Sequence, residues 1–402
     1  MRDDAEALSR EFSTIYALQL AVNLTAVFAY IGYLLIFKPE YGPIPWIQLS
    51  CVVSICFDVS WFFFGLEQFK ITIVRNLIVK ILSLVLIIAL VRQPGDLWLY
   101  SLIMGGSTLV SQVYLFVMLR RYVCFSRPSF DGVARRLREI VVLFIPVAAY
   151  SIYRVLDKAM LGSMSSVTEL GYFENAEKLI NIPIAVIAAL GTVMLPRMSH
   201  IMAKSRSDYR SVIAGSMNLS LMLACSMAMG LIAISEDICP VLFGPGFEGS
   251  AVVIRLLAIT VICSAWSNVI RTQYLIPRSD DGIYVGSTLG AAVVNLCLNI
   301  VLIPPLGAIG ACVGTLGAEL FIVAFQTIAV RKELEVGKYF KRLLEHLGKA
   351  FVMLLLADFL GGFVDYPVER LVVEITAFVV GFLVLNGRFI IKDFFEVGKE
   401  GE

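Results

Sequence analysis

Four basic side chains lie inside stretches that are otherwise apolar: Arg154, Lys158, Lys178 and Arg255. A charged side chain at the centre of a bilayer costs about 2.5–3.5 kcal/mol on insertion scales, so it usually faces a partner or a water-filled cavity. Within a helix, Arg154 and Lys158 would share one face, because residues four apart are neighbours. We interpret the four together as the lining of a cationic cavity. Such a cavity suits a diphosphate, because the Born cost of one bare ion in hydrocarbon is of order 20 kcal/mol.

Four acidic side chains occur in the same apolar setting: Asp58, Asp157, Glu174 and Glu177. A carboxyl group in a partly dry cavity can exchange a proton or attract a cation, so these are candidates for ion coupling or gating. The alternative for any one of these charged residues is a local ion pair near a helix end, with the long basic chains reaching the interface. Both interpretations stay open.

The sequence lacks the motifs of the common enzyme classes. It has no GxSxG, no phosphate-binding P-loop and no HExxH, and it contains only 2 histidines. The 8 cysteines stand mostly inside apolar stretches without CxxC spacing, as small core residues do. The net charge of +1 excludes a field that would attract a polyanion. We therefore expect no enzyme, no cofactor, no metal and no nucleic-acid partner.

The composition is that of a polytopic membrane protein. Hydrophobic residues make up 58% and charged residues 16% of the 402 residues, whereas soluble domains have roughly 45–50% and about 25%. A spanning helix needs about 20 mostly apolar residues. The sequence predicts an all-α chain with about twelve such helices, near 12–37, 44–63, 71–91, 96–118, 138–158, 169–195, 211–235, 250–272, 283–303, 308–330, 347–363 and 369–387.

The distribution of Lys and Arg predicts the orientation. Numbering the connections alternately places most of the 33 basic residues on one side and only Lys38, Arg92 and Arg370 on the other. The basic side is the cytoplasmic one, so we expect both termini there, in a multi-pass protein of the cell membrane. The longest connections on that side, 119–137 and 331–346, are rich in Lys and Arg.

These connections divide the predicted spans into groups. Residues 1–118 hold an N-terminal bundle of four spans, and 119–137 form a basic cytoplasmic linker. Residues 138–330 hold a bundle of six, and 331–402 hold two trailing spans with a cytoplasmic tail.

Four runs of residues resemble the motifs of one family, the Wzx-type O-antigen and exopolysaccharide flippases of the MOP (MATE-like) superfamily. The runs are Phe57-Asp-Val-Ser-Trp-Phe-Phe-Phe-Gly-Leu-Glu-Gln-Phe-Lys70, Asp157-Lys-Ala-Met-Leu-Gly162, Gly171-Tyr-Phe-Glu-Asn-Ala-Glu-Lys-Leu179 and Leu195-Pro-Arg-Met-Ser199. The resemblance covers essentially the whole chain. It places Asp58, Trp61, Asp157 and Lys178 in family-like motifs, and it implies structural roles for Trp61, Gly65, Gly162 and Gly171.

The resemblance implies a MATE-like fold of two helix bundles around a central cavity, followed by two trailing helices. It implies that the chain passes undecaprenyl-diphosphate-linked oligosaccharide from the inner to the outer leaflet by alternating access. The implied partners are that lipid-linked oligosaccharide, the membrane lipids, and the polysaccharide polymerase and glycosyltransferases of the same pathway.

One departure from the family concerns the N-terminus. Family members typically have fourteen spans, and this chain begins where their third would begin. The opening residues 1–11 resemble the inner connection that precedes that span. The sequence is thus expected to lack the first two helices of the first bundle.

Two other functions compete with this hypothesis. A cation-coupled multidrug exporter of the same superfamily would need an acidic, aromatic-lined site, for which Asp58 and Glu319 are candidates, but the basic residues in the spans argue against it. A membrane-bound polysaccharide polymerase or ligase would need a long outer loop carrying catalytic groups. No predicted outer connection is long enough for that.

Overall fold

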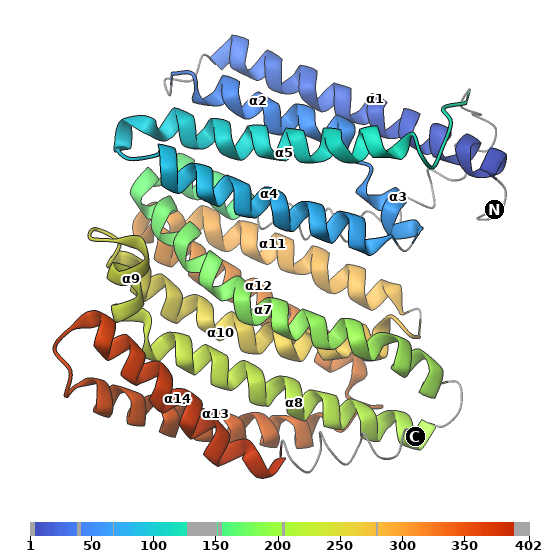
Figure 1. The fold of residues 1–402 in the computed structure, drawn as a ribbon. Helices are drawn as coiled ribbons and strands as arrows, with labels where there is room; N and C mark the ends of the chain where they lie inside the picture. Colours follow the sequence, from blue (N-terminus) through green and yellow to red (C-terminus); the bar gives the residue numbers. More distant parts are fainter. Residues whose placement is uncertain are drawn as a thin grey trace. The chain divides into compact units, whose positions relative to one another are not determined.

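The computed structural model describes residues 5–37, 42–66, 68–126, 151, 155–202, 206–278 and 280–389. The described residues are helical apart from short connections and contain no strand. The chain divides into two compact units, residues 1–138 (unit 1) and 139–402 (unit 2), which are described separately below (Figure 1).

Unit 1 is a set of long helices interrupted by one short broken segment. Its elements are α1 (Ala5–Phe37), α2 (Ile44–Ser54), the 3-10 helix η1 (Ile55–Phe57), α3 (Ser60–Gly65), α4 (Phe69–Leu90), the 3-10 helix η2 (Pro94–Asp96) and α5 (Leu97–Leu119). Helix α2 packs along α5. A Cβ atom at Gly105 of α5 would collide with Ser50 Oγ, so this glycine lets the two helices approach closely.

The core of unit 1 is largely aromatic. Phe12 and Tyr16 of α1 pack with Phe62 and Phe63 of α3, and all four side chains are buried. Their rings meet as stacked or edge-on pairs, such as Phe12 and Phe62 at 5.1 Å between centroids. These rings anchor the short helix α3 against the long helix α1.

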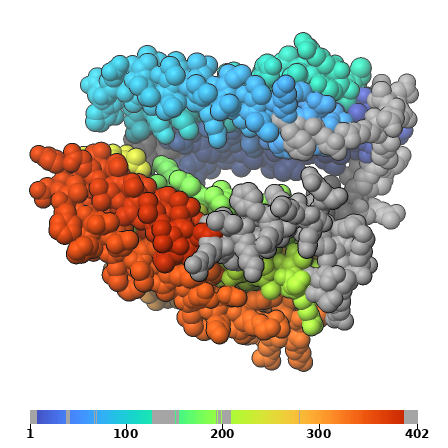
Figure 2. Space-filling view, turned by 60° about the horizontal axis from the view of Figure 1, so that its bottom comes forward, coloured from blue at the N-terminus to red at the C-terminus, as the bar shows by residue number. Residues whose placement is uncertain are grey.

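Unit 2 contains α7 (Val167–Met202), α8 (Arg206–Ala233), α9 (Ser235–Phe243), α10 (Gly249–Ile270), the π-helix η3 (Arg271–Leu275), α11 (Asp281–Leu306), α12 (Ala308–Val330), α13 (Val336–Gly361) and α14 (Pro367–Phe389). Helix α10 is central, because it packs against α7, α8 and α12 and is the most buried of the candidate spans. Helices α13 and α14 pack on each other and on α8 and α9, and Figure 2 shows them on the surface of this unit.

Glycines decide how closely α11 and α12 pack. A Cβ at Gly310 would collide with the backbone of Leu302, and one at Gly314 would collide with the side chain of Asn299. The spacing of these two glycines on α12 is the small-xxx-small pattern that favours close approach of membrane helices. The pattern therefore serves packing, and at Gly314 it also makes room for a buried amide.

Eight of the described helical stretches are long and apolar enough to cross a membrane. They coincide with eight predicted spans, and α7, α13 and α14 coincide with three more. Most of the remaining predicted span, 138–158, lies outside the described residues. The all-α, polytopic fold class predicted from composition is confirmed.

Candidate functional site

The first family-like motif forms a break between two helices of unit 1. Asp58 follows η1 in an extended conformation, and its Oδ1 accepts a hydrogen bond from the backbone N–H of Ser60 at 2.9 Å, at the start of α3. The Asp58 carbonyl oxygen accepts from Gln19 Nε2 at 2.7 Å. Trp61 Nε1 in turn donates to Gln19 Oε1 at 2.8 Å. The side-chain amide of Gln19 in α1 therefore provides hydrogen-bond partners for the Asp58 carbonyl and the Trp61 indole at the helix break.

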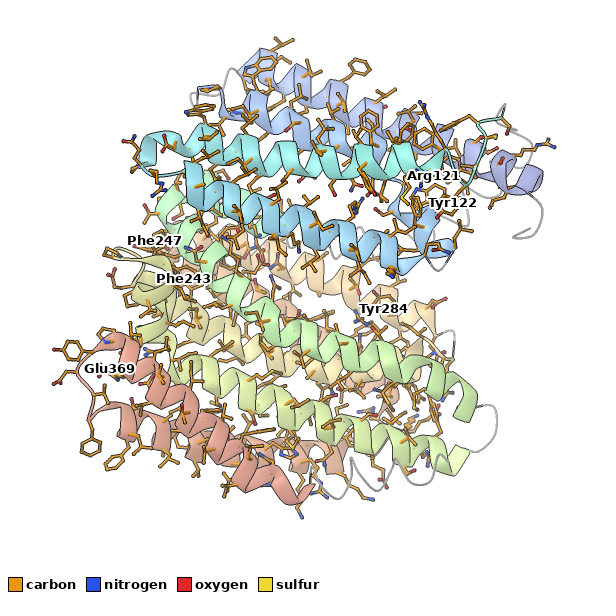
Figure 3. The ribbon with its side chains drawn as sticks, viewed as in Figure 1. Arg121, Tyr122, Phe243, Phe247, Tyr284 and Glu369 are labelled. Carbon is orange, nitrogen blue, oxygen red and sulfur yellow. The ribbon has the colours of Figure 1, made fainter. Side chains whose placement is uncertain are left out.

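The other motif residues of unit 1 surround this break. The Trp61 ring stacks on Phe12, with 5.5 Å between centroids, and Gly65 is the last residue of α3. At the end of α5, Tyr122 packs edge-on against Phe63 at 5.5 Å, beside Arg121 in Figure 3. The motif thus packs α3 between α1 and the end of α5.

Sequence reasoning missed the buried cation of unit 1. Arg75 is counted among the basic residues of the cytoplasmic side, but it lies in α4 with only 7% of its surface exposed. Its guanidinium donates to the Ser111 carbonyl and to Gln112 Oε1, both at 3.2 Å, and to Asn76 Oδ1 at 2.8 Å. Within the described part of the chain it has no carboxylate partner. Its position only six residues after the start of α4 was the available signal.

Unit 2 brings together three of the charged residues expected in a cavity. Lys158, in the helical segment 155–164, lies between two carboxylates of α7. Its Nζ is 2.8 Å from Glu174 Oε1 and 2.7 Å from Glu177 Oε2. Two acids around one base leave this group with a negative formal charge.

Asp157 joins three helical elements. It is 2% exposed, and its carboxylate accepts hydrogen bonds from Asn299 Nδ2 of α11 and from Thr315 Oγ1 of α12, the latter at 2.9 Å. Asn299 also donates to Asn295 Oδ1 at 3.2 Å. Among the described residues, the buried Oδ1 of Asn299 has no hydrogen-bond donor. Sequence reasoning missed both asparagines, although two amides four residues apart in an apolar span share one helix face.

A small cavity of about 40 Å³ lies beside this cluster, which is room for a few water molecules. Its polar lining consists of three carboxyl groups and three hydroxyl groups, from Asp157, Glu177, Glu319, Thr260, Ser264 and Thr315. Such oxygens can exchange protons or contact a small cation. Among the described residues, no three His, Cys, Asp or Glu side chains are grouped so as to hold a metal ion.

The other basic residues predicted for the cavity are distributed differently. Arg255 of α10 lies against α9, with NH2 2.7 Å from Glu236 Oε1 and Nε donating to Ser235 Oγ at 2.8 Å. Lys178 donates to the neutral Asn175 Oδ1 at 3.3 Å. Arg154 lies outside the described residues. Neither Lys158, Lys178 nor Arg255 lines the 40 Å³ cavity, and their role toward a substrate stays a prediction.

The motif glycines of unit 2 lie at the start of α7 and just before it. A Cβ at Gly162 would lie 3.3 Å from Leu170, and one at Gly171 would lie 3.7 Å from the ring of Phe247. Phe247 and Phe243, labelled in Figure 3, meet where α9 turns into α10. At Gly171 a Cβ would therefore meet the ring at an ordinary contact distance, so this packing does not itself require glycine.

Comparisons with known proteins found relatives of this chain. A model of the family described as "Polysaccharide biosynthesis protein" matches residues 11–202. A putative O-antigen transporter of Shigella dysenteriae is 24% identical over 81% of this chain and 84% of its own length. A probable low-salt glycan biosynthesis flippase, Agl15 of Haloferax volcanii, is 27% identical over 40% of this chain and 34% of its own length.

A solved structure shows the same fold. The lipid II flippase MurJ, in an inward closed conformation, matches with a TM-score of 0.76 at 14% identity, over 96% of this chain and 86% of that one. The relatives are transporters and flippases, and the eight candidate spans make this chain a multi-pass membrane protein. The chain is therefore similar to polysaccharide flippases of the Wzx type, and residues 11–202 match the polysaccharide biosynthesis family.

Proposed function

We propose that the chain flips undecaprenyl-diphosphate-linked oligosaccharide across the cytoplasmic membrane by alternating access. The observation that carries the proposal is the group of Lys158, Glu174 and Glu177 inside the helices of unit 2. Charged groups within a bilayer are costly unless they are paired or serve a polar substrate or an ion. The likeness to O-antigen transporters over most of the chain supports the same substrate class.

The basic residues would act on the diphosphate. In this state Lys158 and Arg255 are held by carboxylates, so neither offers an unpaired charge. We propose that an incoming diphosphate competes with Glu174 and Glu177 for Lys158, while Arg154, Lys178 and Arg255 contribute further positive charge to the cavity. A phosphate oxygen can replace a carboxylate oxygen on an ammonium group, because both are anionic acceptors.

The acidic residues would couple transport to an ion. Asp157 and Glu177 face one small cavity, and Glu174 shares Lys158 with Glu177. Protonation or cation binding there would weaken the hold of α7 on Lys158 and favour exchange with the substrate. Asp58, which caps α3 at the break in unit 1, is proposed as a gating residue, since losing the cap would free α3 to move.

The proposal also covers orientation and partners. Both termini are placed in the cytoplasm, because nearly all the Lys and Arg outside the spans then lie on that side. The glycosyltransferases that build the lipid-linked oligosaccharide would act before this step, and a polysaccharide polymerase would act after it.

Reconstituted proteoliposomes test the proposal. Lipid-linked oligosaccharide carrying a labelled sugar is placed in the inner leaflet, and its appearance outside is scored by access of an external glycosidase. We expect flipping that is lost when Arg154, Lys158 and Arg255 are each replaced by glutamine, with the protein still incorporated. Unchanged flipping in all three variants would refute the cationic mechanism. Flipping that continues after both proton and sodium gradients are collapsed would refute ion coupling.

The same preparation separates the competing exporter hypothesis. Liposomes loaded with a cationic dye would retain it if the chain is a flippase and would lose it if the chain is a multidrug exporter. Broad drug resistance on expression, together with dye export and no sugar exposure, would overturn the proposed function.

A further inference from the structure

An apolar groove runs between α10, α12 and α13 of unit 2. Its volume is about 720 Å³, within the roughly 300–1,000 Å³ of typical ligand sites. Its lining includes Trp266 of α10, Leu320 and Ile328 of α12, and Gly337 and Phe340 of α13. Leu320, Ile328 and Phe340 are at least half exposed, so these side chains lack a full protein cover in the described structure.

The groove offers hydrocarbon contacts and little else. Trp266 Nε1 donates to Thr327 Oγ1 at 2.8 Å, so the two polar side chains of the lining satisfy each other. From Leu320 to Ile328 the α12 wall is about 12 Å long at roughly 1.5 Å per residue. One leaflet of a bilayer core is about 15 Å thick. The groove therefore has the length of one acyl chain segment within one leaflet.

Unpaired positive charge borders the groove. Arg331 follows the end of α12, one turn beyond the lining residue Thr327, and Lys341 lies on α13 between the lining residues Phe340 and Leu343. Both are exposed, and no described carboxylate pairs with either. The neighbouring Lys338, Arg342 and Lys349 differ, because they pair with Glu335 or Glu345.

We propose that this groove binds an anionic phospholipid, with an acyl chain against α10, α12 and α13 and the phosphate between Arg331 and Lys341. The hydrocarbon length and the charge complementarity both point to this occupant. Basic residues at the mouth of a cleft between membrane helices are a recognised arrangement for anionic headgroups. The site does not involve the residues of the proposed transport mechanism, so it stands independently of that proposal.

Native mass spectrometry of the purified full chain tests the site. The protein in mild detergent is mixed with equal amounts of phosphatidylglycerol and phosphatidylcholine carrying the same acyl chains. We expect one phosphatidylglycerol to be retained in preference. Each of Arg331→Gln and Lys341→Gln should lower that preference about fivefold, which corresponds to ~1 kcal/mol per basic residue near an anionic lipid. Lys349→Gln is the matched control and should leave the preference unchanged.

A second pair of variants tests the groove itself. A Cβ atom added at Gly337 or at Gly348 would meet nothing within 4 Å, so we expect both glycines of α13 to accept leucine without loss of folding. Gly337→Leu fills the groove and should remove lipid retention at least tenfold, whereas Gly348→Leu lies outside the lining and should retain lipid normally. The two variants should have the same thermal unfolding temperature.

Three results would overturn the proposal. Equal retention of the two lipids would show that no headgroup is selected. Equal retention by Gly337→Leu and Gly348→Leu would place the lipid elsewhere. Displacement of phosphatidylglycerol by an equal concentration of a polyprenyl phosphate would assign the groove to the carrier lipid of the substrate instead.

Discussion

In unit 1 the indole of Trp61 and the carbonyl of Asp58 are joined by the neutral amide of Gln19, whereas in unit 2 the ammonium group of Lys158 is held by two carboxylates. The neutral bonds satisfy groups that a helix break has freed, and no substrate is needed to complete them. The ion pairs hold charges that could equally be paired with a phosphate or an ion. In unit 1 the buried polar groups thus stabilise a helix break, whereas the charges of unit 2 are the ones that we propose to exchange with a substrate or an ion.

The buried cations of the two units show the same difference. Arg75 of unit 1 donates only to neutral oxygens and is 7% exposed, so it is enclosed by its own helices. The side chain of Lys158 is 31% exposed and reaches two acids on α7. A cation with solvent access and replaceable partners is better suited to a moving substrate than one that is enclosed.

The largest expected effect is at Asp157. Replacement by alanine removes the acceptor of one buried Asn299 N–H, which costs about 1–3 kcal/mol, whereas Thr315 Oγ1 keeps the Ala311 carbonyl as its acceptor. We expect a lower unfolding temperature in detergent and a loss of surface polysaccharide in a flippase-deficient strain. Asp157→Asn keeps the shape and should recover most of the stability but not the export. Wild-type behaviour of the alanine variant would remove this cluster from the mechanism.

Lys158→Met tests whether the charge of unit 2 is exchangeable. Removal leaves two like charges side by side, and we expect a loss of about 1–2 kcal/mol, between the ~0–1 of exposed pairs and the 3–5 of buried ones. The triple variant Lys158→Met, Glu174→Gln and Glu177→Gln should regain stability, because no charge is left unpaired. Export should stay lost in both variants. If the triple variant exported polysaccharide normally, Lys158, Glu174 and Glu177 would have a structural role only.

Trp61→Phe tests the contrasting claim for unit 1. It removes one bond to Gln19, and interhelical hydrogen bonds in membrane proteins average about 0.6 kcal/mol. Gln19→Leu removes two bonds and should cost about twice as much, and the double variant should resemble Gln19→Leu alone. Unfolding temperatures measure all three. Additive losses would show that the amide does not link the two residues.

The smallest expected effect on stability is that of Arg255→Gln. The side chains of Arg255 and Glu236 are 39% and 63% exposed, and exposed ion pairs contribute about 0–1 kcal/mol. We expect wild-type amounts of protein in the membrane with reduced export of polysaccharide, measured by immunoblot and surface staining. Glu236→Gln is the matched control and should keep export. Equal export by the two variants would show that Arg255 does not contribute to transport and would leave Lys158 as the proposed substrate-binding cation of this pair.

Composition and hydropathy sufficed to predict the helical fold class, because any helix that crosses a bilayer needs about 20 apolar residues in a row. The Lys158 group was also within reach, since charged residues in apolar stretches are conspicuous. The burial of Arg75 could not be predicted, because a basic residue near the start of a helix is equally compatible with a cytoplasmic connection.

The sequence by itself determined which segments are helices and which of them contain charged residues, because both follow from local composition. Tertiary structure alone decided the partners. Asp157 meets Asn299 and Thr315 from far along the chain, and the three come together only because Gly314 lets α11 approach α12. Distant contacts depend on how helices pack against each other: the glycine spacing of α12 indicates a close approach but not which residues of α11 it meets.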